Sequence, residues 1–193
     1  MEDAARRWDQ RYRREEMPRG AAALLVEEAS LLPRGGKALD VAMGNGRNAL
    51  YLASLGFQVT GIDISSVAVE RCRQRARALG LSVTAIAADL ERHPLPVAEY
   101  DLVVNFNYLQ RSLVGPLVAA LKPGGVLVFE TFTTEQRRFG AERSADLRPY
   151  GPKDPEHVLR PGELRQLFPS LEPLFYREEV VPGEKGPKAI ASL

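Results

Sequence analysis

Short apolar runs alternate, along the first two thirds of the chain, with segments whose apolar residues recur every three or four positions. The short runs are typical of buried β-strands, and the longer segments are typical of amphipathic helices. Strands are expected at residues 37–42, 57–63, 82–87, 100–105 and 126–131. Helices are expected at residues 45–55, 66–79 and 116–121. Strands joined by helices of this length predict βαβ units and a parallel sheet.

Residues that favour helix ends support these boundaries. Ser65 is placed to cap the helix that follows it, and Gly56 and Gly80 stand where two helices stop. The sequence KPGG, residues 122–125, is expected to end a helix before the fifth strand.

The last third of the chain has a different pattern. Residues 133–160 are polar and proline-rich without a clear period, so we expect a long loop, which in a compact domain is usually functional or disordered. Pro161 is expected to start a short helix, GELRQLF. Residues 171–181 and 188–193 read as two more strands joined by a turn, and the chain stops inside the second, so the natural protein is expected to run longer.

These elements predict an α/β fold, a Rossmann-like doubly wound seven-stranded sheet that is mostly parallel with an antiparallel last strand. No repeat or boundary divides the chain, so residues 1–193 are expected to form a single domain.

Composition narrows the class of protein. The 193 residues are 45% hydrophobic and 26% charged, with a net charge of +1, so no global charge attracts nucleic acid or a membrane surface. Cys72 is the only cysteine, which excludes an internal disulfide and favours the cytoplasm. The N-terminus is charged, unlike a signal peptide, and no apolar run approaches the ~20 residues that span a bilayer.

The stretch ALDVAMGNGRNALYLA, residues 38–53, connects the first strand to a helix through two glycines. In such sheets, ligands bind beside the carboxyl end of the first strand. Gly44, Gly46 and Ala49 match the G-x-G-x-x-A pattern of dinucleotide loops, with Asp63 17 residues after Gly46 as a ribose ligand. Asp40, however, would repel a pyrophosphate and would attract a ligand that carries an ammonium group.

Several segments in order resemble the class I methyltransferases that use S-adenosyl-L-methionine (SAM). Residues 40–46 resemble their motif I, an acidic residue followed by G-x-G-x-G, with Ala42 in place of the first glycine. GIDIS (61–65) is similar to the segment whose acidic residue binds both ribose hydroxyls. AADLERHPLP, YDLVVNFNYL and LKPGGVLVFE are similar to the later motifs in order and spacing.

The resemblance implies a SAM site and S-adenosylhomocysteine (SAH) as product. In it, Asp40 and the backbone of Ala42 and Gly44 bind the methionine part, Asp63 binds the ribose, and Ile64 packs on the adenine. The remaining residues it implies are Gly46 in the loop, Asp89 and Leu90 at the adenine, and Asn105 below the sulfonium. Asp63 as a helix cap and Asn105 as a plain strand-end hydrogen bonder are the alternatives.

The segment after the fourth strand bears on the acceptor. Asn105-Phe106-Asn107-Tyr108 resembles the N-P-P-Y of base-modifying enzymes but lacks both prolines, and the chain has no appended nucleic-acid domain, so we do not expect nucleic acid to be the partner. Asn105 and Tyr108 are the catalytic candidates. An anionic acceptor needs no general base, whereas an amine or a hydroxyl does. The sequence leaves open whether this protein uses a general base.

The opening WDQRY, residues 8–12, resembles the tellurite-resistance and thiopurine methyltransferases, small single-domain enzymes. This resemblance implies a small-molecule acceptor, including soft or anionic nucleophiles. Residues 4–16 are expected to form a lid helix that covers SAM with Trp8 and Tyr12. The alternative is an amphipathic helix with a solvated basic face.

Residues 133–160 are expected to line the acceptor side. The acceptor-side candidates are Trp8, Tyr12, Arg111, Arg148 and Tyr150. His93, His157 and Cys72 lack metal-ligand spacing, so no metal site is expected; His157 is expected to be an exposed loop residue and Cys72 a packing residue.

We expect a monomer or a homodimer. A nucleic-acid or protein methyltransferase and, in another class, a non-catalytic SAM-binding module are the rival functions.

Overall fold

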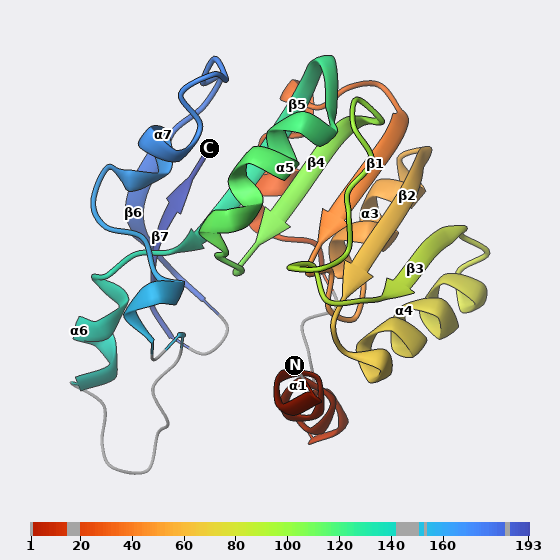
Figure 1. Ribbon diagram of the computed structural model, residues 1–193, viewed down its shortest axis with the longest axis horizontal. Coiled ribbons are helices and arrows are strands. Elements are labelled where there is room, and N and C mark those ends of the chain that lie inside the picture. Colours follow the sequence, from red (N-terminus) through yellow and green to blue (C-terminus); the bar gives the residue numbers. More distant parts are fainter. Residues whose placement is uncertain (1, 15–19, 142–150, 153, 184–185) are drawn as a thin grey trace. The chain divides into compact units, whose positions relative to one another are not determined.

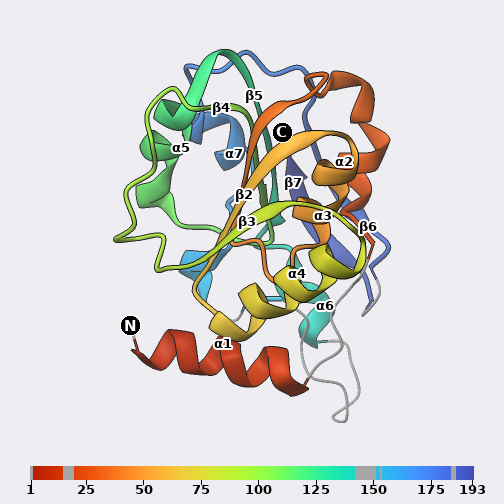
Figure 2. The same ribbon diagram turned by 90° about the vertical axis from the view of Figure 1, so that its right-hand side faces the viewer.

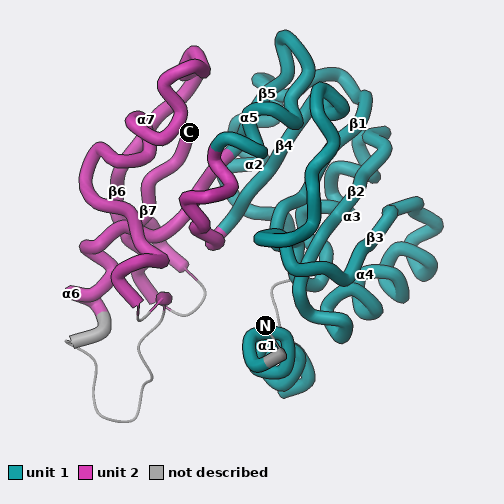
Figure 3. The backbone as a smooth tube through the Cα atoms, in the orientation of Figure 1, with its two compact units in different colours: residues 1–106, 115–128 teal, residues 107–114, 129–193 magenta. Residues whose placement is uncertain are grey.

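The computed structural model describes residues 2–14, 20–141, 151–152, 154–183 and 186–193. These residues form two compact units, which Figure 3 distinguishes by colour. Unit 1 contains residues 1–106 and 115–128, and unit 2 contains residues 107–114 and 129–193. The chain therefore passes from unit 1 to unit 2 and back before it ends in unit 2.

Unit 1 is built on parallel strands whose centre is mostly apolar. Its first four strands are β1 (Gly36–Val41), β2 (Phe57–Asp63), β3 (Val83–Ala87) and β4 (Tyr100–Phe106). β1 pairs in parallel with β2 on one side and with β4 on the other, and β3 pairs in parallel with β2. The side chains of Leu39, Val41 and Leu102 on these strands are fully buried, as expected for the near-continuous apolar runs of a sheet that is covered on both faces.

The helices of unit 1 are α1 (Glu2–Arg14), α2 (Ala23–Glu27), α3 (Arg47–Ser54), α4 (Ser66–Ala78) and α5 (Val114–Ala120). Figure 2 shows α2, α3 and α4 on one face of the strands and α5 on the other. α1 lies beyond the ends at which β1 and β2 finish (Figures 1 and 2). The expected cap is confirmed, because the Ser65 side chain accepts a hydrogen bond from the Ala68 backbone N–H at the start of α4.

Unit 2 contains the end of β5 (Leu121–Phe132), β6 (Arg177–Val181), β7 (Lys188–Ser192), α6 (Gln136–Ala141) and α7 (Glu163–Leu167). β7 runs antiparallel to both β5 and β6. The seven strands follow the order β3-β2-β1-β4-β5-β7-β6. The predicted Rossmann-like, mostly parallel sheet with an antiparallel last strand is thereby confirmed.

The start of the fifth strand differs from the expectation. β5 begins at Leu121 and contains residues 122–125, which were expected to precede it. A Cβ atom added to Gly125 would lie 3.0 Å from the Lys122 carbonyl oxygen and 3.1 Å from the Tyr100 carbonyl oxygen, a crowded position that favours glycine. The glycines therefore belong to the strand and do not separate it from the helix.

The segment 133–160 is not loop throughout, because α6 forms within it. Gln136 anchors this helix: its side-chain oxygen accepts from the Ala189 N–H at 2.7 Å, and its amide donates to the Pro187 carbonyl at 3.2 Å. These partners lie more than fifty residues away, so no local pattern reveals them. The following short helix, α7, begins at Glu163 after Gly162 as its N-cap, two residues later than Pro161 indicated.

The packing of α3 on the sheet can be tested with a matched pair of leucines. Leu52 is fully buried on α3, whereas Leu55 at its C-terminal end is 47% exposed. Leu52→Ala should lower the free energy of unfolding by about 2–5 kcal/mol, because truncation leaves a cavity. Leu55→Ala should change it by no more than about 0.5 kcal/mol. Urea unfolding measures both, and equal losses would contradict the observed burial of α3.

Candidate cofactor-binding site

The loop after β1 has a left-handed backbone at three alternate positions. Ala42, Gly44 and Gly46 have φ values of 51°, 58° and 78°. The Met43 N–H between them donates to the Ile62 carbonyl at 3.0 Å, which fixes the loop beside β2. This conformation strains Ala42, because the left-handed region costs an L-residue other than glycine roughly 1–2 kcal/mol.

Glycine is required in this loop for space as well as for conformation. A Cβ atom at Gly46 would lie 2.2 Å from the Cys72 sulfur on α4, and one at Gly44 would lie 2.5 Å from the Tyr12 hydroxyl oxygen on α1. The loop is therefore closely packed between two helices. Cys72 is fully buried against Met43 and Val69, and its predicted packing role is confirmed.

Asp40 lies near the end of β1 and is 1% exposed. Its Oδ2 atom accepts a hydrogen bond from the Ala49 N–H in the first turns of α3 at 2.9 Å. Burial raises the pKa of Asp40 to about 7, although the Ala49 hydrogen bond and the Arg47 charge oppose this rise. The site thus holds a carboxyl group that a nearby cation would convert to its charged form.

Asp63 ends β2 and is 5% exposed. Its Oδ2 accepts from the Gly44 N–H and its Oδ1 from the Ser65 N–H, both at 2.8 Å. Burial raises the pKa of Asp63, and the two backbone hydrogen bonds oppose that rise. Ser65, not Asp63, caps α4, so the carboxylate of Asp63 instead ties the glycine loop to the start of that helix.

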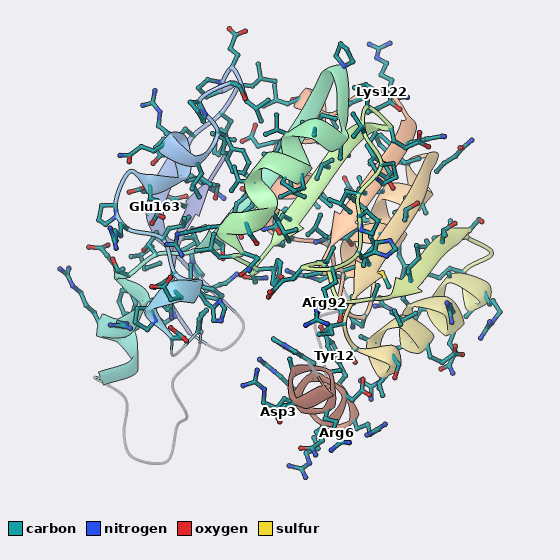
Figure 4. All side chains as sticks on the ribbon, viewed as in Figure 1. Asp3, Arg6, Tyr12, Arg92, Lys122 and Glu163 are labelled. Atoms are coloured by element: carbon teal, nitrogen blue, oxygen red, sulfur yellow. The ribbon has the colours of Figure 1, made fainter. Side chains whose placement is uncertain are left out.

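Tyr12 lies against the glycine loop. It is 5% exposed, and Figure 4 shows it on the side of α1 that faces the strands, with Arg6 on the far side. Burial and the nearby Asp63 raise the pKa of Tyr12. Trp8 is 38% exposed, and its ring centroid lies 6.0 Å from that of Tyr12. The Arg11 guanidinium lies 5.0 Å from the Trp8 ring centroid.

The other predicted residues of unit 1 lie at the same ends of neighbouring strands. Asn105 is 1% exposed near the end of β4, where its register partner on β1 is Val41. Leu90 is buried, and Ile64 and Asp89 are half-buried. The Asp89 carboxylate accepts from the Glu91 N–H at 3.1 Å in the turn after β3. The structure thus brings Asp40, Asp63 and Asn105 to the carboxyl ends of three adjacent strands.

Arg111, an acceptor-side candidate, is engaged within unit 2. Its guanidinium donates to both carboxylate oxygens of Glu163, at 2.7 and 3.1 Å, and to the backbone carbonyls of Glu156 and Val158. These contacts join the segment after β4 to the start of α7 and favour a structural role for Arg111. Tyr108 is half-buried in unit 2, and Arg148 and Tyr150 lie outside the described residues.

Two residues of the site escaped the sequence analysis, namely Asp9 and Arg47. Asp9 is part of the WDQRY segment, but its hydrogen-bond partners lie on α4, more than fifty residues away. Arg47 begins α3, where its charge favours the ionised form of Asp40. Both act through contacts that form only when the chain folds.

Among the described residues, no three histidine, cysteine or acidic side chains gather closely enough to hold a metal ion. His157 is exposed, as expected, with Nδ1 3.4 Å from the Leu109 carbonyl oxygen. No helix in the described part of the chain combines the length and apolar character that crossing a membrane requires.

Comparison with known proteins shows what this chain is similar to. Residues 38–125 match the family model described as a methyltransferase domain. The ubiquinone biosynthesis O-methyltransferase of Vibrio vulnificus (strain YJ016) is 32% identical over 145 residues, which is 69% of this chain and 62% of that protein. The chain therefore spans less than two thirds of the length of this relative.

Solved structures share the fold. TehB from Haemophilus influenzae aligns with a TM-score of 0.70 at 20% identity, over 89% of this chain and 60% of that one. A SAM-dependent methyltransferase from Methanosarcina mazei aligns with the same TM-score and identity, over 90% and 95% of the two chains. In sequence over residues 38–125, and in fold, the chain is therefore similar to methyltransferases, among them one that depends on S-adenosyl-L-methionine.

Proposed function

We propose that this protein transfers a methyl group from SAM to a small-molecule acceptor, with residues 1–193 acting as a single domain. One observation carries the proposal: two buried carboxylates, Asp40 and Asp63, flank a left-handed glycine loop at the carboxyl ends of β1 and β2. A pyrophosphate beside the glycine loop would be repelled by the charge of Asp40. A ligand with an ammonium group and a ribose complements the two carboxylates.

SAM supplies a methyl group on a sulfonium, which the acceptor lone pair takes in an in-line displacement while the C–S bonding electrons return to sulfur and leave SAH. In our proposal the protein orients the methyl group and the acceptor in line and excludes water from the site. Asp40 pairs with the ammonium group, beside the backbone of Ala42 and Gly44. Asp63 accepts from the ribose hydroxyls, Ile64 and Leu90 pack on the adenine, and Asp89 accepts from its amino group.

The geometry of Asp63 is compatible with this role. Each carboxylate oxygen can accept about two hydrogen bonds, and the Gly44 and Ser65 backbone N–H groups use one on each. One acceptor position therefore remains on each oxygen for a ribose hydroxyl. The two backbone bonds also hold the carboxylate in one orientation, so a ligand would not have to order it.

For the acceptor, we propose an oxygen nucleophile on a small molecule, because the relative at 32% identity is named an O-methyltransferase. A soft nucleophile is the second class, from the resemblance of WDQRY to the tellurite-resistance group. Asn105 and Tyr108 stay the catalytic candidates, with Trp8, Arg148 and Tyr150 on the acceptor side. We further propose a cytoplasmic protein, monomeric or dimeric, without a nucleic-acid partner.

An acceptor panel tests the function. The protein with SAM should release SAH above the acceptor-free rate with a catechol or a thiol, and not with an oligonucleotide or a peptide. The Asp63→Ala protein serves as the inactive control. Binding of SAM without SAH release from any acceptor would point to a non-catalytic SAM-binding module instead.

The role of Asp63 predicts a defined loss of cofactor affinity. Asp63→Ala should weaken SAH binding by roughly 2–4 kcal/mol, since a hydrogen bond to a charged group contributes about 1.5–3 kcal/mol and water replaces part of it. Glu70→Ala, which removes an exposed carboxylate from α4, should leave the affinity unchanged. Titration calorimetry on folded protein measures both. Unchanged affinity in Asp63→Ala would mean that Asp63 only organises the loop.

The raised pKa of Asp40, about 7, predicts a pH dependence of binding. Below pH 7 the group is mostly protonated, and an ammonium-bearing ligand must displace that proton. The affinity for SAH should therefore rise with pH between 5.5 and 7, approaching tenfold per unit, and level off above 7. The same raised pKa makes the stability of the ligand-free protein change with pH in the opposite direction. The stability that Asp40 contributes is fully present below about pH 3.8, the pKa of the unfolded chain, and is lost as the pH rises through about 7.

Asp40→Asn provides the control for this dependence. It should bind SAH more weakly and with a flat profile between pH 5.5 and 7.5. Calorimetry at several pH values decides the matter, and a wild-type affinity that is the same at pH 5.5 and 7.5 would contradict the pairing of Asp40 with the ammonium group.

A further inference from the structure

The helix α1 contacts the start of α4 through a single carboxylate. Asp9 Oδ1 accepts from the Ser65 hydroxyl at 2.6 Å and from the Val67 N–H at 3.2 Å, and Oδ2 accepts from the Ser66 hydroxyl at 3.2 Å. Asp9 thus provides a second cap to α4 from a different helix. A negative charge at this position also complements the positive N-terminal end of the helix dipole.

Ser65 connects this cap to the ribose-binding carboxylate proposed above. Its hydroxyl donates to Asp9 and accepts from the Ala68 N–H, while its own backbone N–H donates to Asp63 Oδ1. Displacement of Asp9 would therefore act on Ser65, and through Ser65 on one oxygen of Asp63.

A second contact of α1 reaches the other oxygen of Asp63. Tyr12 packs against Gly44, and the Gly44 N–H donates to Asp63 Oδ2. Asp9 and Tyr12 are three residues apart, so they lie on the same face of α1. The two contacts of α1 thus fall on the two residues whose backbone N–H groups hold Asp63.

The surroundings of Asp9 favour its charged form. Burial alone would raise the pKa of Asp9, but hydrogen bonds from Ser65, Val67 and Ser66 together outweigh burial, and the pKa is lowered. Arg13, one turn further along α1, approaches Oδ2 at 4.0 Å from the solvent side. Alanine at position 9 would lose all of these contacts, whereas asparagine, with one oxygen, would lose part of them.

We infer that Asp9 is a positioning residue for the cofactor site, whose cap on α4 keeps α1 docked and Asp63 aligned, so that docking of α1 and binding of the cofactor stabilise each other. The inference rests on the proposed SAM site. Because such coupling is reciprocal, the loss of SAH affinity on undocking α1 equals the loss of SAH-dependent protection of α1.

Limited proteolysis measures the docking of α1 directly. The helix carries five arginines, at positions 6, 7, 11, 13 and 14, and trypsin cleaves after arginine only when the segment opens. In the wild-type protein, SAH should slow cleavage within α1. Asp9→Ala should be cleaved there about tenfold faster without ligand, and SAH should bind about tenfold more weakly, the change expected on losing a helix cap worth about 1.4 kcal/mol.

Asp3→Ala is the matched control, since it removes one carboxylate from the exposed start of the same helix. It should match the wild type in both measurements. Asp9→Asn guards against misfolding, because the amide oxygen can still accept from Ser65 or Val67; it should fall between the wild type and Asp9→Ala. All three variants should remain folded without urea and unfold in a single transition, with the lowest midpoint in Asp9→Ala because it loses the cap.

The outcomes separate this inference from the proposed function. Absence of SAH binding to the wild type overturns both. Wild-type binding with cleavage of Asp9→Ala at the wild-type rate overturns the inference alone. Faster cleavage of Asp9→Ala with unchanged SAH affinity also overturns it, because Asp9 would then hold α1 without acting on the cofactor site.

Discussion

The carboxylate of Asp63 is the contact on which the geometry of the site depends. It ends one buried strand and joins two backbone N–H groups that belong to different segments, the glycine loop at Gly44 and the start of α4 at Ser65. Other contacts join the same two segments: the Arg75 guanidinium on α4 donates to the Asn45 carbonyl at 3.1 Å, and Met43 packs against Val69 and Cys72. An acid at this position is favoured over its amide, since an amide has one acceptor oxygen where the carboxylate has two.

Burying the carboxyl groups of this site costs desolvation energy, and nearby backbone N–H groups offset part of that cost. Asp40 and Asp63 are both almost completely buried, and burial raises the pKa of each. Backbone N–H groups offset part of that cost, through Ala49 for Asp40 and through Gly44 and Ser65 for Asp63. A ligand that brings a positive charge and hydroxyl donors relieves more of it. The ligand-free site therefore holds carboxylates whose desolvation favours binding of such a ligand.

Sequence predicted the parts of this molecule that local chemistry determines. Apolar runs located β1, β2 and β4 to within a residue or two, and Ser65 was identified as a cap because its role involves only the next three residues. The two glycines, 44 and 46, indicated the loop because their backbone conformation is local too. Asp40 and Asp63 were singled out because each ends a strand beside that loop.

The features that sequence did not predict depend on partners far along the chain. Gly125 looked like a break, but it lies within β5, close to the Tyr100 carbonyl of β4. α6 was missed because its anchor, Gln136, bonds to Pro187 and Ala189. Arg111 looked available for an acceptor until Glu163 was found to occupy its guanidinium.

Asp9 follows the same rule, with a consequence for how the N-terminal segment is interpreted. The aromatic residues of WDQRY drew attention because large rings suggest a ligand cover, yet the small acid between them, Asp9, accepts three hydrogen bonds from the start of α4. An exposed Trp8 can be replaced by another apolar residue at modest cost, since it is already partly in water. The acid cannot, because it satisfies a backbone N–H and two hydroxyls at a helix start with one charge. In our proposal, binding of the cofactor and attachment of α1 therefore depend on the same small set of polar contacts around Ser65.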